Sequence, residues 1–233
     1  MKPELTIVIP AYNEENRLGN SISKIIKYFK EKQIEIIVVD DGSFDNTVSV
    51  ASSFKNVKVL ENKENIGKGY SVKQGVLAAK ANFVLFSDAD LSTPIEDIEK
   101  LWKYKEEYDI VIGSRKSKGA KVVEKQPPWR VFAGNIFPII ARIMTGLTIK
   151  DTQCGFKLFN MKKCRKVFEK MTIDGFSFDV EMLYIAKKQG LKIKEVGVDW
   201  YNDNASKVSL IKDSIHMFTD LIKIKIKDFL GRY

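Results

Sequence analysis

The sequence predicts an α/β protein built on a mostly parallel sheet, and three observations support this prediction. Short runs rich in β-branched residues alternate with amphipathic stretches through the first half of the chain. Such alternation is typical of strand–helix–strand units, in which the crossover helix makes neighbouring strands parallel. The 233 residues suit one compact domain, because 44% of them are hydrophobic while only 14 are Gly and 6 are Pro.

The predicted elements follow one another in a regular order. The short apolar runs are predicted as strands at 5–9, 35–39, 57–60, 83–86 and 110–112. The amphipathic stretches between them are predicted as helices at 17–32, 46–54, 68–80 and 95–106.

The second half of the chain is less regular. Residues 114–128 are expected to form a mobile basic loop that ends in two prolines, and an apolar helix follows at 131–147. Periodicity then predicts a helix at 178–189, a strand at 193–198 and a Lys-rich helix from about residue 208.

Composition limits the class of protein. Cys154 and Cys164 are too few for a disulfide framework, and the nine residues between them match no zinc-binding spacing. The apolar run at 5–9 is too short for a secretory signal. The stretch at 131–147 contains Arg142 and falls short of the roughly 20 apolar residues that span a bilayer. We therefore expect a protein of a reducing compartment, without a transmembrane helix.

The positive charge is concentrated in one segment. The net charge of the chain is +9. Residues 1–113 carry 15 basic and 18 acidic side chains, whereas residues 114–170 carry 14 basic and only 3 acidic side chains. Nucleic acid and anionic membranes both attract such a segment. The stretch PPWRVFAGNIFPIIARIMTGL within it mixes aromatic and aliphatic residues with only two Arg, which favours a lipid headgroup boundary over nucleic acid. A buried core helix has the same periodicity, so that alternative stays open.

Polar clusters directly follow three of the predicted strands, at 10–14, 40–43 and 87–90. Because the carboxyl ends of parallel strands meet at one edge of a sheet, these clusters are expected to converge. Asp88 and Asp90 offer alternating carboxylates, the hard oxygen ligands of a divalent cation that also binds phosphates. The sequence Ser92-Thr93-Pro94 predicts a helix N-cap with Pro at the first helical position, which leaves the aspartates free for this role.

Taken together, five motifs resemble those of the inverting nucleotide-sugar glycosyltransferases of family 2, which have the GT-A fold. The motifs are VIPAYNEE at 8–15, IIVVDDGSFDNT at 36–47, ENIGKGYSVKQG at 64–75, FSDADLSTP at 86–94 and VIGSR at 111–115. Further segments resemble the polyprenyl-phosphate branch of the family, which includes dolichyl-phosphate glucosyl- and mannosyltransferases. These segments are DTQCGFKLF at 151–159, FSFDVEMLYIAKKQG at 176–190 and Ser-Lys-Val at 206–208. The QCGFK form is closer to the glucosyl-type members.

The resemblance implies a single GT-A domain over 1–233, with a nucleotide-sugar half at 1–113 and an acceptor half at 114–233. The residues implied for the nucleotide sugar are Pro10, Ala11, Tyr12, Glu14, Asp40, Asp41, Gly67, Lys68, Asp88, Ala89 and Asp90. Tyr12 would stack on the base, and Asp90 would be the first ligand of Mg²⁺ or Mn²⁺, with Asp88 beside it. Ser92 stands where mannosyl-type members often have Gln, which leaves the preferred metal open.

The acceptor implied by the resemblance is a lipid phosphate, which is mostly dianionic at neutral pH because its second pKa is roughly 6. Such an acceptor needs cations to bind it and scarcely needs a general base. The candidates for binding it are Arg115, Arg130, Lys157, Ser206 and Lys207. Asp151 and Asp179 are the candidates for a carboxylate base or a sugar-hydroxyl ligand, and His216 is expected to be structural.

The resemblance thus implies an enzyme on the cytoplasmic face of a membrane that transfers a hexose with inversion, with UDP-glucose favoured as donor. Helices near 129–147 and 208–230 would lie at the membrane surface, or a partner subunit would supply the anchor. The possible protein partners are such an anchoring subunit or further copies in a homo-oligomer, and nucleic acid is not an expected partner. The alternatives are GDP-mannose as donor, or a soluble saccharide or protein as acceptor. The terminal helix also has the pattern of a core helix.

Overall fold

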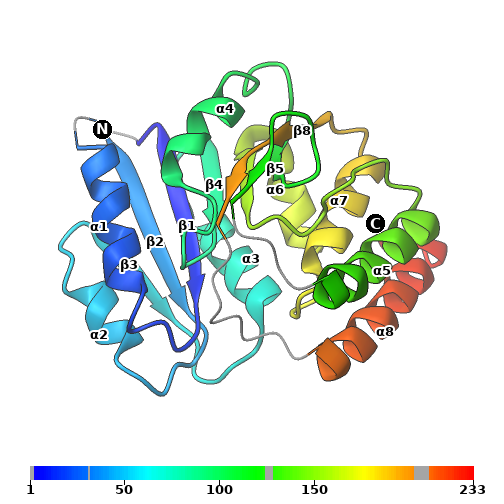
Figure 1. Ribbon diagram of the computed structural model, residues 1–233, viewed down its shortest axis with the longest axis horizontal. Helices are drawn as coiled ribbons and strands as arrows, with labels where there is room; N and C mark the ends of the chain where they lie inside the picture. The colour runs from blue at the N-terminus through cyan, green and yellow to red at the C-terminus, as the bar shows by residue number, and fades with distance from the viewer. Residues whose placement is uncertain (1–2, 31, 124–127, 202–209) are drawn as a thin grey trace.

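The computed structural model describes residues 3–30, 32–123, 128–201 and 210–233, and for 128–136 and 210–215 it describes the backbone alone. Within these residues a seven-stranded sheet forms the centre of the molecule, in the order β3-β2-β1-β4-β7-β5-β8 (Figure 1). Its strands are β1 (Leu5–Ala11), β2 (Ile34–Asp40), β3 (Val57–Glu61), β4 (Phe83–Ser87), β5 (Ile110–Ser114), β7 (Phe156–Asn160) and β8 (Ile193–Gly197).

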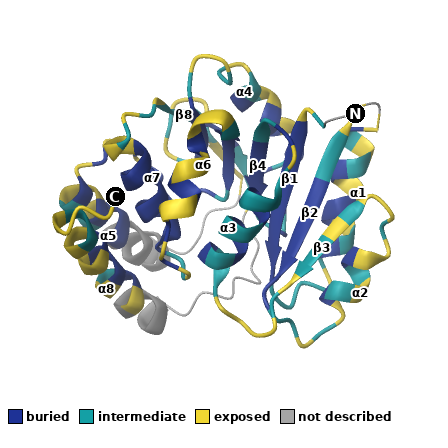
Figure 2. Ribbon diagram, turned by 180° about the vertical axis from the view of Figure 1, so that it is seen from behind, coloured by how far each residue is buried: buried dark blue, intermediate teal, exposed yellow. Residues whose placement is uncertain are grey.

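The sheet is mostly parallel, as the sequence predicts. β1 pairs in parallel with β2 and β4, β2 with β3, and β5 with β8. Only β7, among the strands of this sheet that the structure describes, runs antiparallel to its neighbours β4 and β5. All seven residues of β1 are buried, because helices cover both faces of the sheet. Figure 2 shows the central strands as largely buried.

Helices flank the sheet in two layers. They are α1 (Leu18–Tyr28), α2 (Thr47–Ser52), α3 (Lys68–Ala78), α4 (Ile98–Trp102), α5 (Pro128–Thr145), α6 (Met161–Lys170), α7 (Phe178–Lys188) and α8 (Leu210–Phe229), with a 3₁₀ turn η1 (Ile95–Asp97) before α4. Alternate residues of β1 serve different cores. Ile7 and Ile9 pack with α1 and α4, whereas Val8 packs with α3, α6 and α7.

The structure corrects the sequence prediction in three places. The strand β7 and the helix α6 were not predicted. The segment at 114–128 contains a short strand, β6 (Lys121–Val122), which pairs with β9 (Asp199–Trp200) just after β8. The predicted N-cap is wrong, because Pro94 precedes η1 instead of starting it and the backbone N–H of Ser92 donates to Asp90 Oδ1 at 2.8 Å.

The helices α5 and α8 lie side by side at the end of the molecule far from β3 (Figure 1). Each buries one face: Phe137 and Ala141 of α5 and Leu221 and Ile224 of α8 belong to the core. Other apolar side chains of the same helices are exposed, namely Ile139, Ile143, Ile222, Ile226 and Phe229. Each helix therefore has one face that is buried, as a core helix would have. Its other face exposes apolar side chains, as a helix at a membrane surface would.

No helix among the described residues combines the length and the apolar character needed to cross a bilayer.

Candidate functional site

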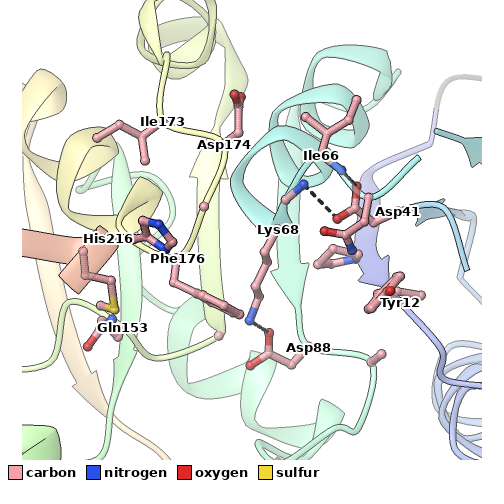
Figure 3. A pocket seen from close by; sticks show the side chains of 18 of the residues that line it. Tyr12, Asp41, Ile66, Lys68, Asp88, Gln153, Ile173, Asp174, Phe176 and His216 are labelled. Carbon is pink, nitrogen blue, oxygen red and sulfur yellow. Dashed lines mark hydrogen bonds and ion pairs between the residues drawn. The ribbon is translucent and has the colours of Figure 1, made fainter. Parts of the chain in front are cut away.

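A cavity of about 830 Å³ opens at the carboxyl ends of β1, β2 and β4. Residues from all three predicted polar clusters line it, so their expected convergence is confirmed. In Figure 3, Tyr12 and Asp41 lie on one side of the Lys68–Asp88 pair, and Gln153 and His216 lie on the other. The cavity thus has two ends with a charged pair between them.

The first end is organised by the neighbouring residues Asp40 and Asp41, which act differently. Asp41 lines the cavity, and its carboxylate accepts hydrogen bonds from the backbone N–H groups of Ile66, at 3.1 Å, and Gly67, at 2.9 Å. Asp40 lies outside the cavity lining, and its carboxylate accepts the N–H groups of Gly42 and Ser43 and the Ser43 hydroxyl. The side chain of Asp40 therefore shapes the turn after β2, and its predicted contact with the nucleotide sugar stays a prediction.

The segment after β1 supplies the wall of this end. Pro10, Ala11 and Tyr12 line the cavity, and the Tyr12 ring meets the exposed Phe44 ring edge-on, with centroids 6.4 Å apart. The carboxylate of Glu14 accepts two hydrogen bonds of 2.7 Å from the guanidinium of Arg17. Glu14 thereby holds a cation, Arg17, that lines the cavity and that the sequence analysis did not identify.

Lys68 enters the cavity from the first turn of α3. Gly67, just before it, has a φ of +136°, and a Cβ there would lie 2.3 Å from the carbonyl oxygen of Asp174. That carbonyl accepts the N–H of Gly69 at 2.6 Å, so the glycine loop packs closely against the segment at 172–176. From this position the Lys68 ammonium reaches Asp88 Oδ1 at 2.6 Å (Figure 3).

A second, deeper ion pair supports the first. Lys157 Nζ lies 2.5 Å from Asp179 Oδ1 and also donates to the carbonyl oxygen of Cys154 at 2.6 Å. Lys157 is completely buried and both residues lie outside the cavity lining. The ammonium groups of Lys68 and Lys157 each lie 5.5 Å from the centre of the Phe86 ring. Lys157 therefore stabilises the floor beneath the cavity, and its predicted contact with an acceptor phosphate does not fit this position.

Asp88 and Asp90 both face the cavity and fit a divalent cation. A Cβ at Gly155 would lie 1.8 Å from Asp88 Oδ2, so the carboxylate rests in a space that only glycine leaves open. Burial, and then repulsion by Asp88, raises the pKa of Asp90. No group of three or more His, Cys, Asp or Glu among the described residues is placed so that it could hold a metal ion by itself. Two carboxylates completed by phosphate oxygens and water are a donor set typical of Mg²⁺.

Arg115 lines the cavity just after β5 and is held rigidly. Its Nε and Nη2 donate to the two carboxylate oxygens of Asp151 at 2.8 and 2.7 Å, and its guanidinium lies 5.5 Å from the Trp200 ring. Burial disfavours both charges, but the hydrogen bonds and attraction within the pair prevail, so the pKa of Asp151 is lowered and that of Arg115 is raised. Asp151 is buried outside the cavity lining, so its position suits a partner of Arg115 and not a base.

Three predicted acceptor-site groups cannot be placed. The side chain of Arg130 and the residues Ser206 and Lys207 lie outside the described residues.

Several residues that line the cavity were not predicted as site residues. Among them are Arg17, Asn65, Gln153, Gly155, Asp174, Phe176, Trp200, His216, Lys223 and Lys227. Gln153 and Gly155 belong to the DTQCGFKLF segment, so a signal for them was present in the sequence. His216, expected to be structural, is exposed and faces the cavity from α8. Phe176 begins the FSFDVEMLYIAKKQG segment, whereas the residues at 172–175 belong to no motif that would have indicated their position.

Comparison with known proteins places these observations in a family. The sequence matches the family model described as glycosyl transferase family 2 over residues 6–168. It is 36% identical to the dolichyl-phosphate beta-glucosyltransferase of Dictyostelium discoideum, over 97% of this chain and 75% of that protein. It is 34% identical to the protein of the same name from Drosophila melanogaster, over 99% of this chain and 77% of that protein.

Solved structures with a similar fold include two sugar-phosphoglycerate synthases. Mannosyl-3-phosphoglycerate synthase from Rubrobacter xylanophilus superposes with a TM-score of 0.70 at 17% identity, over 99% of this chain and 76% of that one. Glucosyl-3-phosphoglycerate synthase from Mycobacterium tuberculosis, in complex with Mn²⁺, UDP and glucosyl-3-phosphoglycerate, superposes with a TM-score of 0.66 at 19% identity. This comparison covers 99% of this chain and 80% of that one. These similarities confirm the GT-A fold.

Proposed function

The chain belongs to glycosyl transferase family 2, and from that premise we propose that it transfers glucose from UDP-glucose to a dolichyl or other polyprenyl phosphate. The observation that carries the proposal is the arrangement of one cavity. Its carboxylate pair, Asp88 and Asp90, lines the cavity together with Tyr12 and the fixed cation Arg115, and Lys68 binds Asp88 (Figure 3). Such a cavity suits a donor diphosphate at its centre and an anionic acceptor at the Arg115 side. The names of the relatives support glucose and dolichyl phosphate.

The donor half of the cavity suits a nucleoside diphosphate. Tyr12 offers its ring to the base, and the Asp41-bound loop brings the backbone of Gly67 to the edge of the cavity. Lys68 supplies a positive charge for the diphosphate. Bound by Asp88 and Asp90, Mg²⁺ or Mn²⁺ would stabilise the negative charge that develops on the leaving UDP.

The acceptor half requires a bound anion. In the proposed reaction a lipid phosphate oxygen attacks the anomeric carbon opposite the bond to UDP, which breaks as the new bond forms and inverts the configuration. Arg115 would hold that phosphate, and Asp151 would keep the guanidinium in place. Because the phosphate is mostly dianionic at neutral pH, the attack needs no general base.

We place the enzyme at the cytoplasmic face of a membrane, bound through the exposed apolar face of α5 and α8. That surface, called here the α5/α8 apolar face, consists of Ile139, Ile143, Ile222, Ile226 and Phe229. Lys223, Lys225 and Lys227 lie on the same helix α8. Apolar and cationic side chains on one helix pair are typical of proteins that lie on anionic bilayers.

A donor and acceptor panel tests the proposed function. The purified protein is incubated with UDP-glucose, UDP-galactose or GDP-mannose and a short polyprenyl phosphate, with Mn²⁺, Mg²⁺ or a chelator. We expect labelled lipid from UDP-glucose with a metal present. Asp90→Asn should abolish the product, whereas Glu107→Gln, an exposed carboxylate away from the cavity, should not. Product from GDP-mannose, or label only on a soluble saccharide, would contradict the proposed donor or acceptor.

A further inference from the structure

The loop at 150–155 runs from Asp151, which binds Arg115, to Gly155, which packs against Asp88, and it is fixed by contacts from outside the loop. The N–H groups of Lys150 and Asp151 donate to Glu195 at 2.9 Å each, and Asp151 binds Arg115. Farther along, the carbonyl of Cys154 accepts the buried Lys157 ammonium, and the carbonyl of Gly155 accepts the N–H of Asp88 at 3.1 Å. These contacts leave the loop little freedom.

Within this loop, Gln153 directs a side chain into the cavity. It is half-buried and lines the cavity, and its amide has no hydrogen-bond partner among the described residues. Figure 3 shows it on the same side of the Lys68–Asp88 pair as His216 and on the opposite side from Tyr12. A partly buried amide without a partner loses hydrogen bonds to water, so a ligand that supplies them is favoured.

The two ends of the loop define what lies opposite Gln153. Asp151 orients Arg115, the proposed ligand of the acceptor phosphate, and Gly155 supports Asp88, the proposed neighbour of the donor diphosphate. The transferred hexose must lie between the donor diphosphate and the acceptor phosphate, because it is bonded to the diphosphate and attacked by the acceptor phosphate. Gln153 is midway along the loop that joins them.

We propose that the Gln153 amide hydrogen-bonds hydroxyl groups of the transferred hexose and thereby determines which sugar is accepted. The inference rests on the proposed function. An amide carries both a donor and an acceptor, so it distinguishes hydroxyl orientations by direction. The fixed loop makes this distinction effective. Because the loop cannot move, Gln153 cannot shift to reach a hydroxyl group that points in another direction.

The test compares Gln153→Met, which keeps the length but removes the hydrogen bonds, with Gln33→Met, an exposed glutamine before β2 outside the cavity. Calorimetry with Mg²⁺ gives the Kd of UDP, UDP-glucose and UDP-galactose, which differs from UDP-glucose only at C4. Transfer to a short polyprenyl phosphate gives kcat/KM. We expect Gln153→Met to lower kcat/KM for UDP-glucose about ten- to a hundredfold and to reduce the preference over UDP-galactose. The Kd of UDP should change less than about twofold.

Equal weakening of UDP and UDP-glucose would overturn the proposal, because Gln153 would then act on the nucleotide or on folding. An unchanged preference between the two sugars, with only the KM of the lipid raised, would overturn it as well. Failure of the proposed function is recognised separately, since the unmodified protein would then transfer no hexose to lipid. In that case the effect of Gln153→Met on the ratio of the Kd values of the two sugar nucleotides still decides whether this amide contacts the hexose.

Discussion

Four charged side chains of alternating sign run from the cavity into the core. Asp88 and Lys68 are each 30% exposed, whereas Asp179 is 7% and Lys157 0% exposed. Burying a charge is costly unless an opposite charge and hydrogen bonds compensate it. In this structure Lys68 neutralises Asp88 and Lys157 neutralises Asp179. At the residue scale, Lys68 therefore has two roles, since the cation proposed to bind the donor diphosphate also holds a proposed metal ligand.

The double role of Lys68 predicts opposite effects on two ligands. Lys68→Met should tighten the binding of Mn²⁺ to the nucleotide-free protein several-fold, because the two carboxylates lose the cation that neutralises them. The same change should weaken UDP about tenfold or more, because the diphosphate loses a charged partner. Electron paramagnetic resonance of free Mn²⁺ and calorimetry with UDP measure the two effects. Lys80→Met, an exposed lysine just after α3, is the control, and weaker Mn²⁺ binding to Lys68→Met would contradict the prediction.

Gly155 gives a second prediction for a single residue. Gly155→Ala places a methyl group 1.8 Å from the present position of Asp88 Oδ2, so the carboxylate must move. We expect transfer to fall by at least about a hundredfold, because a small displacement of a metal ligand is costly. Gly175→Ala is the matched control: Gly175 also lines the cavity, but a Cβ there meets nothing within 4 Å. Equal activities of the two variants would show that Asp88 does not need its present position.

At the scale of elements, β7 decides the shape of the site and is one of the elements that the sequence did not reveal. It lies antiparallel between β4 and β5, and Lys157 and Gly155 come from this strand and the residue before it. The sequence FKLFN has a lysine within its apolar run, which argues against a buried strand. Asp179, which compensates that lysine, is 22 residues away, so the cause of its burial is not local. The strands and helices of the first half were predictable because local patterns specify them.

The junction of β5, α6 and β8 depends on Asp109, and this dependence predicts a pH effect. Asp109 Oδ2 accepts the N–H of Lys192 at 2.8 Å, and Oδ1 lies 2.7 Å from the Lys163 ammonium. Burial disfavours the charge, but these contacts outweigh it and lower the pKa of Asp109. A carboxyl whose pKa is lower when folded stabilises the fold above its unfolded pKa, and this stabilisation is lost as the pH falls.

Asp109→Asn should therefore lower the free energy of unfolding by about 1–3 kcal/mol at pH 7. Urea unfolding from pH 7 down to pH 4 checks this value, and the difference from the unmodified protein should narrow below about pH 5. Lys163→Met removes only the exposed partner and should have a smaller effect. A difference that is constant over this range would mean that the charge of Asp109 does not contribute.

For the whole molecule, the sequence predicted the convergence of the site better than the roles of its members. Three clusters were expected at one sheet edge because each directly follows a strand, and the carboxyl ends of parallel strands meet at the same edge. The difference between Asp40 and Asp41 was not predictable, since it depends on the turn at Gly42 and on the loop at 64–67. The pairing of Arg115 with Asp151, 36 residues away, likewise needed the folded chain.

The orientation of the whole molecule on a membrane gives the last prediction. The double variant Ile143→Glu/Phe229→Glu alters the two most exposed positions of the α5/α8 apolar face, 77% and 91% exposed. Burying each side chain in lipid contributes about 1.5–3 kcal/mol, so the variant should lose flotation with anionic liposomes. Phe44→Glu replaces an equally exposed aromatic, 89%, at the Tyr12 end, and should float like the unmodified protein. If all three proteins behaved alike, an anchoring subunit or a further segment, and not this face, would determine membrane binding.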